Sequence, residues 1–165
     1  MKKVLVTGGA GYIGSACSEY LLDRGYEVTI FDALITGHRA AVDPRAKFIL
    51  GNLADRELIK KDCREGEFAA FSLVGESMQN PSKYFRNNLA SGINLADAAV
   101  EGGVKNFVFS STAATFGQPE SIPIRENDRQ IPINPYGESK LCFEKVLKWY
   151  SEIHGMKYAA LRYFN

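Results

Sequence analysis

The stretch VLVTGGAGYIG, residues 4–14, indicates the fold more strongly than any other part of the chain. Its apolar start is typical of a buried parallel strand, and the apolar spacing of residues 15–22 predicts a helix. Gly8, Gly11 and Gly14 lie in the turn between the two. Residues without a Cβ let the backbone turn tightly and approach a pyrophosphate, and the helix points its free N–H groups and positive dipole end at the anion. The stretch therefore predicts a dinucleotide site.

A carboxylate follows at the position where the ribose of a dinucleotide is expected. The second strand-like run, residues 27–31, ends in Asp32. This acid can accept hydrogen bonds from the ribose hydroxyls and favours NAD over NADP, because a 2′-phosphate would meet a negative charge. His38 and Arg39 leave NADP open as the minor alternative, since an Arg near the turn can also hold a phosphate. We interpret both as solvated loop residues.

Strand-like and helix-like segments alternate along the chain, which predicts a parallel sheet with helices on both faces. We assign the sequence to the α/β class, as a Rossmann-like doubly wound sheet. The predicted strands span residues 4–7, 28–32, 47–50, 106–111 and 158–164, and the predicted helices span residues 12–24, 56–64, 81–101 and 135–154. Residues 117–134 are predicted to form a long irregular loop, of the kind that often lines an active site.

One strand of this scheme is nearly missing from the sequence. Only twelve residues separate Asp55 from Phe68, about the length that a crossover helix alone needs. A strand of about five residues should follow that helix, yet only residues 68–71 are apolar. In the strand order 3-2-1-4-5 this fourth strand lies beside the first, inside the sheet. We therefore expect a shortened fourth strand, caused by an internal deletion or a missing piece of chain.

Length and charge limit the domain organisation and the kind of partner. At 165 residues the chain fits one domain, and we expect residues 1–165 to form an NAD-binding Rossmann-like domain that is incomplete and truncated at its C-terminus, without a separate substrate domain. A net charge of +1, from 20 basic and 19 acidic residues, favours a small-molecule partner over nucleic acid or a membrane surface.

The cysteines and the apolar runs indicate the compartment. Cys17, Cys63 and Cys142 are scattered and outside any C-x-x-C spacing, which favours reduced thiols in a cytoplasmic protein and no metal site. The first strand begins directly after residues 1–3, which leaves no room for a signal sequence, and no apolar run approaches the roughly 18 residues of a membrane span.

A second group of residues indicates acid/base chemistry. Tyr136 and Lys140 are four residues apart on a predicted helix, so they share one face. A tyrosine that acts as a base near neutral pH must lower its pKa by about three units, and a lysine ammonium contributes in that direction. Ser110, Ser111 and Thr112 end a predicted strand, where open α/β sheets bind ligands and where a hydroxyl can hold the reacting oxygen of a substrate.

These motifs together resemble the extended short-chain dehydrogenases/reductases. The resemblance covers nearly the whole chain and is carried by residues 7–14, 110–112, 135–140 and 162–165. Residues 11–15 and the segment SLVGESM, residues 72–78, make the epimerases that act at C4 of UDP-glucose the most similar branch. That branch implies a tightly held NAD, oxidation of the C4 hydroxyl of a UDP-hexose to a 4-keto sugar, rotation of this sugar, and return of the hydride to its other face.

The resemblance also implies roles for single residues. Tyr136 would be the base, Lys140 would lower its pKa and bind the nicotinamide ribose, and Thr112 would hold the C4 oxygen; with Asn165, Thr112 and Tyr136 would contact the substrate. Asn52 stands where the family usually has an Asp near the adenine, which weakens that contact. The cofactor contacts implied in full are Gly8, Gly11, Tyr12, Ile13, Gly14, Asp32, Asn52, Leu53, Phe68, Ala69, Ala70, Asn87, Ser110, Tyr136, Lys140 and Tyr163.

Several alternatives stay open at this point. The chain is either the cofactor part of an NAD-dependent UDP-hexose epimerase or a non-catalytic dinucleotide-binding module. For the epimerase, a homodimer is one possible assembly. Other UDP-sugars, such as UDP-glucuronate, UDP-pentoses and N-acetylated sugars, fit the same motifs. A 4,6-dehydratase is disfavoured, because Ala113 follows Thr112 where that enzyme has an acid. The 165 residues alone are not expected to interconvert sugars, because the part that would hold the uridine diphosphate is missing.

Overall fold

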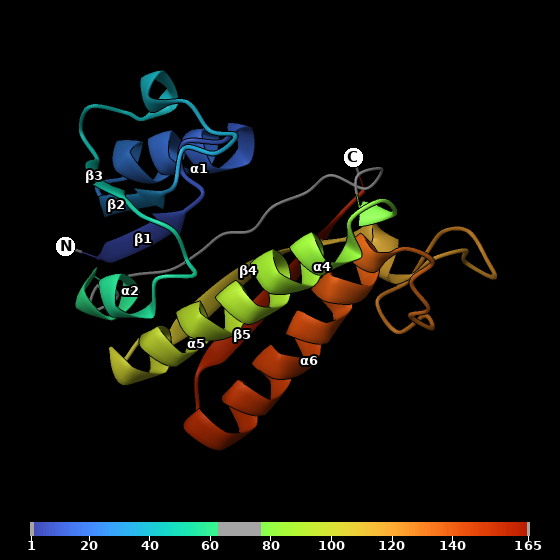
Figure 1. The fold of residues 1–165 in the computed structure, drawn as a ribbon. Helices are drawn as coiled ribbons and strands as arrows, with labels where there is room; N and C mark the ends of the chain where they lie inside the picture. Colours follow the sequence, from blue (N-terminus) through green and yellow to red (C-terminus); the bar gives the residue numbers. More distant parts are fainter. Residues whose placement is uncertain (1, 63–76, 165) are drawn as a thin grey trace.

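The computed structural model describes residues 2–62 and 77–164, and it has the α/β architecture that the sequence predicts (Figure 1). Along the chain the elements are β1 (Lys3–Thr7), α1 (Tyr12–Asp23), β2 (Glu27–Asp32), β3 (Lys47–Leu50), α2 (Arg56–Asp62), α4 (Pro81–Tyr84), α5 (Ser91–Glu101), β4 (Asn106–Thr112), α6 (Pro135–His154) and β5 (Lys157–Tyr163). Short 3₁₀ turns lie at Arg39–Ala41 and Ala113–Thr115, and a π-helical segment lies at Phe85–Ala90.

Among the described residues all strand pairs are parallel, as predicted. β2 lies between β1 and β3, with Val6 opposite Ile30 and Ile30 opposite Phe48. A second sheet pairs β4 with β5 and sets Thr112 opposite Tyr163. Within the described residues β1 pairs only with β2, and β4 only with β5. The strand that we expect between β1 and β4 falls in residues 63–76, outside the described residues, so its shortening stays a prediction.

One hydrophobic core joins the two sheets. Leu5 and Phe31 come from the first sheet, while Phe107 and Phe109 come from the second. Phe143 of α6 packs between these strands and α5, with its ring centroid 4.9 Å from that of Phe109 in an edge-to-face arrangement. Figure 1 shows α5 and α6 side by side over the same face of β4 and β5. The core therefore holds the two strand groups in one α/β unit, although they are not hydrogen-bonded to each other within the described residues.

Two helical segments have clear sequence causes. The predicted helix 81–101 is α4, the π-helical segment and α5 in succession; Asn80 caps its start, and its Oδ1 accepts a hydrogen bond from the Lys83 N–H. α6 begins after Asn134, whose Oδ1 accepts from the Gly137 N–H at 2.7 Å, and ends at Gly155, whose φ of 70° suits a glycine. Local capping chemistry thus sets where the helix of Tyr136 and Lys140 starts and stops.

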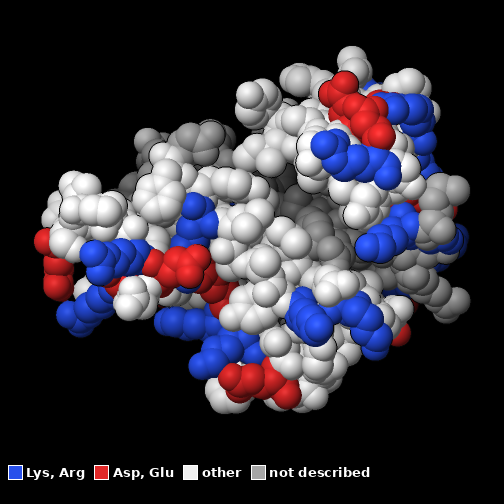
Figure 2. All heavy atoms as spheres, turned by 180° about the vertical axis from the view of Figure 1, so that it is seen from behind, with Lys and Arg blue, Asp and Glu red and all other residues white. Residues whose placement is uncertain are grey.

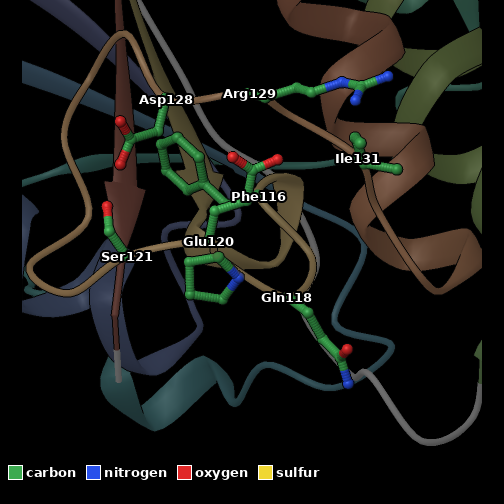
Figure 3. A pocket seen from close by; sticks show the side chains of 8 residues that line it. Phe116, Gln118, Glu120, Ser121, Asp128, Arg129 and Ile131 are labelled. Atoms are coloured by element: carbon green, nitrogen blue, oxygen red, sulfur yellow. The ribbon is translucent and has the colours of Figure 1, made fainter.

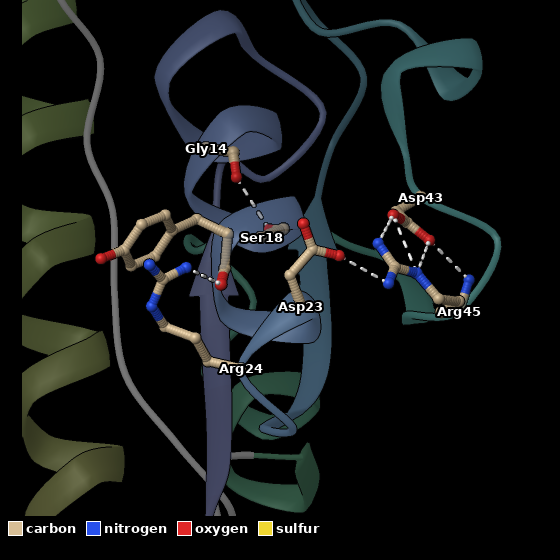
Figure 4. Close-up of polar contacts among 7 residues, drawn as sticks. Gly14, Ser18, Asp23, Arg24, Asp43 and Arg45 are labelled. Carbon is tan, nitrogen blue, oxygen red and sulfur yellow. Dashed lines mark hydrogen bonds and ion pairs between the residues drawn. The ribbon is translucent and has the colours of Figure 1, made fainter.

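Polar contacts fix α1 against the β2–β3 connection (Figure 4). Arg45 binds Asp43 through two nitrogens and reaches Asp23 at the end of α1 at 2.8 Å. The hydrogen bonds from Arg45 lower the pKa of Asp43 to about 2. Arg45 and Asp23 are exposed and Asp43 is only partly buried, so the pairs contribute orientation more than free energy of folding.

In the two described ranges, no helix combines the length and the apolar character that a membrane crossing requires. On the face drawn in Figure 2, acidic and basic side chains are interspersed rather than gathered in one broad patch, in line with the net charge of +1.

Candidate functional site

The glycine turn packs the start of α1 directly onto the end of β1. Gly8 has a φ of 70° and donates its N–H to the Phe31 carbonyl at 2.9 Å, and Gly11 donates to the Gly8 carbonyl at 3.0 Å. A Cβ built on Gly14 would lie 2.3 Å from the Gly8 oxygen, closer than any side chain allows. The turn therefore requires glycine at this point for the close approach of its own backbone.

The N-terminus of α1 has no side-chain cap among the described residues. Gly11 is the N-cap residue and offers no side chain to accept a hydrogen bond from this end of α1. Tyr12 is 90% exposed, so its side chain does not cover the helix end. The first N–H groups of a helix lack intrahelical partners and carry the positive end of its dipole. This end of α1 can therefore accept an anionic group such as a pyrophosphate.

Asp32 is buried at the carboxyl end of β2 and braces the same turn. Its Oδ2 accepts a hydrogen bond from the Ala10 N–H at 2.9 Å, and its Oδ1 accepts from the Leu34 N–H at 2.8 Å. A carboxylate has about four acceptor positions, so two remain for hydroxyl donors. Arg39, the residue that left NADP open, stacks its guanidinium over the Phe48 ring with 4.6 Å between Cζ and the ring centroid.

The segment predicted to lie near the adenine is tied to α5. Asn52 uses its Oδ1 to accept from the Ala54 N–H at 2.9 Å, and the Leu53 carbonyl accepts from the Asn94 amide at 3.1 Å. Sequence reasoning missed Asn94. Its only signal was a polar residue in an otherwise apolar stretch of the predicted helix 81–101.

Lys140 and Tyr136 lie together on the buried face of α6. Lys140 is 1% exposed, and its Nζ donates a hydrogen bond to the Ser110 carbonyl at 2.9 Å. The Nζ lies 5.7 Å from the centroid of the Tyr136 ring and 5.0 Å from that of Phe109. Burial lowers the pKa of Lys140 to about 7. The pair predicted from its spacing is therefore buried at the end of β4, and the ammonium group of Lys140 titrates near neutral pH.

Thr112 lies at the same place, on the last position of β4. Its Oγ1 accepts from the Ala114 N–H at 3.1 Å, which leaves its hydroxyl hydrogen free to be donated. A Cβ on Gly137 would be 2.5 Å from the Ala114 oxygen, so the first turn of α6 packs directly on the turn after Thr112. This contact brings the end of β4 and the start of α6 together, and Thr112 and Tyr136 lie within two residues of it in the sequence.

The last residue of α4 and the π-helical segment that follows add side chains that sequence reasoning missed. Tyr84 packs edge-on against Tyr136, with 6.2 Å between ring centroids, and the Asn88 amide donates to the Ser139 hydroxyl at 3.1 Å. Ser139 in turn donates to the Tyr136 carbonyl at 2.8 Å. Asn87, predicted as a cofactor contact, is half-buried beside Asn88. The spacing of positions 84 and 88 on one helix was the signal that could have identified both.

The remaining predicted site residues divide into two groups. Tyr163 lies at the end of β5, opposite Thr112 in the parallel register. Phe68, Ala69, Ala70 and Asn165 lie outside the described residues, so their predicted contacts stay predictions.

A pocket in the loop after β4 does not include the expected catalytic side chains (Figure 3). Its lining combines an aromatic ring with acidic, basic and amide groups from Phe116, Gln118, Pro119, Glu120, Ser121, Asp128, Arg129 and Ile131. Over the described ranges, no group of three or more His, Cys, Asp or Glu side chains is arranged to hold a metal ion.

Comparison with known proteins identifies one family. Residues 4–165 match the model of the NAD dependent epimerase/dehydratase family. The UDP-glucose 4-epimerase of Streptococcus mutans is 54% identical, with 98% of this chain and 51% of that protein covered, and that of Lacticaseibacillus casei is 50% identical with the same coverage. The chain thus spans about half the length of the curated relatives it matches.

Solved structures give the same result. The UDP-glucose 4-epimerase of Brucella ovis, in complex with NAD, matches with a TM-score of 0.95 and 41% identity. The match covers all of this chain and 52% of the Brucella ovis chain. The enzyme of Thermotoga maritima with UDP-glucose has a TM-score of 0.93 and 32% identity, covering 97% of this chain and 54% of that one.

Proposed function

Because the chain belongs to the NAD dependent epimerase/dehydratase family, we propose that it is the NAD-binding part of an epimerase that inverts C4 of a UDP-hexose, UDP-glucose or UDP-galactose. In this proposal residues 1–165 are the Rossmann-like cofactor domain, and a further domain holds the nucleotide-sugar. The observation that supports the proposal most directly is that Tyr136 and Lys140 are both buried at the end of β4, where Lys140 donates a hydrogen bond to the Ser110 carbonyl. A module that only binds a dinucleotide has no need of this pair.

The residues of the glycine turn fit NAD. The uncapped N-terminus of α1 suits the pyrophosphate, and the close contact between Gly14 and Gly8 leaves backbone rather than side chains at this point. Asp32 has acceptor positions left for the ribose hydroxyls and would repel a 2′-phosphate. Arg39 is engaged with Phe48, which supports NAD over NADP.

Tyr136 would remove the proton from the C4 hydroxyl of the sugar and later return it. Its phenol must lose a proton near neutral pH, and the charged form of Lys140 favours the phenolate. Burial opposes that charge by lowering the pKa of Lys140 to about 7, so the ammonium and the neutral amine are both present near neutral pH. The hydrogen bond to the Ser110 carbonyl keeps the Nζ in place in either state.

Thr112 would hold the C4 oxygen during this proton transfer, through the hydroxyl hydrogen that its contact with Ala114 leaves free. NAD, when bound, supplies the chemistry of hydride uptake and return, so that the sugar passes through a 4-keto form. Asn165 would contact the nucleotide-sugar. The long loop at residues 117–134 would exclude water from the reacting atoms.

Assembly and location belong to the same proposal. A homodimer is supported by Trp149 and Ile153 of α6, which are 60% and 69% exposed although both are apolar. Light scattering of the purified protein tests this, and replacing both residues by Ser should give a monomer. A cytoplasmic location is supported by the free thiols of Cys17 and Cys142.

The test joins residues 1–165 to the second half of the Streptococcus mutans relative and measures conversion of UDP-galactose to UDP-glucose. The matched control is the same chimera with Tyr136→Phe, which keeps the ring and removes the proton acceptor. We expect NAD binding in both by calorimetry, and turnover that falls about 100-fold or more in the variant.

Two results would contradict the proposal. A folded chimera that binds NAD without turnover would favour a non-catalytic dinucleotide-binding module. Equal turnover by the chimera and by its Tyr136→Phe variant would show that the phenol only packs.

A further inference from the structure

A buried carboxylate, that of Glu144, lies one turn beyond Lys140 on α6 and forms an ion pair with a partly buried arginine. Glu144 receives two hydrogen bonds from Arg162 of β5, one from Nε to Oε1 at 3.1 Å and one from Nη2 to Oε2 at 2.7 Å. The side chains are 8% and 22% exposed. The hydrogen bonds from Arg162 to Glu144 raise the pKa of Arg162, which therefore stays charged. Two parallel bonds between a guanidinium and a carboxylate define one orientation of the two groups.

The same carboxylate also accepts a hydrogen bond from β4. Glu144 Oε1 accepts a hydrogen bond from the Ser111 hydroxyl at 2.5 Å, while Lys140 donates to the carbonyl of the preceding residue, Ser110. Residues i and i+4 of α6 thus hold two consecutive residues of the strand. Because these bonds are directional, they fix how far α6 slides along β4, which apolar packing alone does not.

The pair also reaches the loop after β4. Arg162 Nη1 donates to the Glu126 carbonyl at 3.3 Å, and its guanidinium lies 5.1 Å from the centroid of the Phe116 ring. Gln130 donates to Glu144 Oε2 at 3.5 Å. One buried carboxylate therefore connects the end of β4, the helix α6 and, through Gln130 and Arg162, the loop after β4.

We propose that Glu144 and Arg162 are positioning residues, which act through Ser111 to keep Lys140 and Tyr136 of α6 aligned with the end of β4. The catalytic importance of this alignment rests on the proposed function, but the alignment itself can be measured without it. A pair that served stability alone could be replaced by apolar residues without loss of geometry. The alignment predicts instead that weakening the contact changes the surroundings of Lys140.

The test uses the 165-residue chain and two variants. Ser111→Ala removes the contact to β4 and leaves the ion pair intact, and Glu144→Gln removes the charge. The matched control is Ser18→Ala, which also removes a buried hydroxyl that donates to a carbonyl, that of Gly14 at 2.8 Å, in α1 (Figure 4). Trace acetylation with acetic anhydride over a range of pH, quantified by mass spectrometry, gives the apparent pKa of Lys140. Urea unfolding gives the stability of each variant.

We expect the apparent pKa of Lys140 to rise by about one unit in both variants, a tenfold change in proton affinity, because water reaches the ammonium when α6 shifts. It should stay unchanged in Ser18→Ala, even where stability falls equally. An unchanged pKa of Lys140 in folded Ser111→Ala overturns the proposal, whether or not Glu144→Gln folds. NADH titration of the unchanged chain reports separately on the proposed function. If the unchanged chain does not bind NADH while the apparent pKa of Lys140 still shifts in the variants, the proposed function is refuted and the positioning role is retained.

Discussion

The ammonium nitrogen of Lys140 lies 2.9 Å from the backbone carbonyl oxygen of Ser110, thirty residues earlier in the chain. The bond joins the first half of α6 to the last residues of β4 and lies in a region that excludes water almost completely. A buried charge with one hydrogen bond costs more free energy than an exposed one, and this cost makes the stability of the fold depend on pH.

The first prediction concerns this dependence. The pKa of Lys140 is lowered to about 7 in the folded chain, while an unfolded lysine has its ordinary value near 10.4. Between these values the unfolded state binds more protons, so the contribution of Lys140 to the free energy of unfolding rises as pH increases from about 7 to about 10. The free energy of unfolding of the original chain minus that of Lys140→Met should therefore become more positive as pH rises, by at most about 1.4 kcal/mol per pH unit.

Urea unfolding of both proteins at several pH values measures this difference. Taking the difference cancels the titration of the other groups that the two proteins share. A difference that stays constant over this range would show that Lys140 keeps an ordinary pKa in the folded state.

The second prediction concerns the glycine turn. Gly14→Ala places a Cβ 2.3 Å from the Gly8 oxygen, so the turn must open and the N-terminus of α1 must move. We expect NAD affinity to fall at least about tenfold, equal to about 1.4 kcal/mol, as measured by calorimetry. The control is Gly103→Ala, at a φ of 75° with open space around it, which strains the backbone far from the turn. Equal affinity in Gly14→Ala and the unchanged chain would argue against a pyrophosphate at this turn.

The third prediction concerns the choice of cofactor. Asp32 should make NAD bind at least about tenfold more tightly than NADP, because its carboxylate accepts from hydroxyls and repels phosphate. Asp32→Asn removes the charge, keeps the shape and should reduce this preference. Calorimetric titration with both cofactors decides the matter, and tighter binding of NADP by the unchanged chain would make the assignment wrong.

The fourth prediction concerns Asp97 of α5, which contacts both α6 and α2. Asp97 accepts a hydrogen bond from the Tyr150 hydroxyl at 2.5 Å and pairs with Arg56 at 3.1 Å. Burial and this hydrogen bond raise the pKa of Tyr150 to about 12. Asp97→Ala should lower the free energy of unfolding by about 1–3 kcal/mol, whereas Arg56→Ala, at an exposed position, should lower it by less than about 1 kcal/mol. Urea unfolding compares the two, and equal losses would place the main interaction in the ion pair of Asp97 with Arg56, because both variants remove it.

The sequence by itself determined the features that depend on neighbouring residues. The parallel strands, the glycine turn and the caps of α6 follow from apolar period, missing Cβ atoms and side chains that bond to nearby backbone. The shared face of Tyr136 and Lys140 follows from the helical period alone. The α/β class and the family were therefore predictable from short segments, because each signal lies within a few residues of the feature that it specifies.

Tertiary structure alone decided the partners of these side chains. Lys140 bonds to Ser110 across thirty residues, and Glu144 meets Ser111 and Arg162 from elements that are distant in the chain. Arg39 could have faced a phosphate, yet it stacks on Phe48. Such contacts depend on how far α6 slides along β4 and on which face each loop packs. Those distances arise from the packing of the whole core, and no local period in the sequence encodes them.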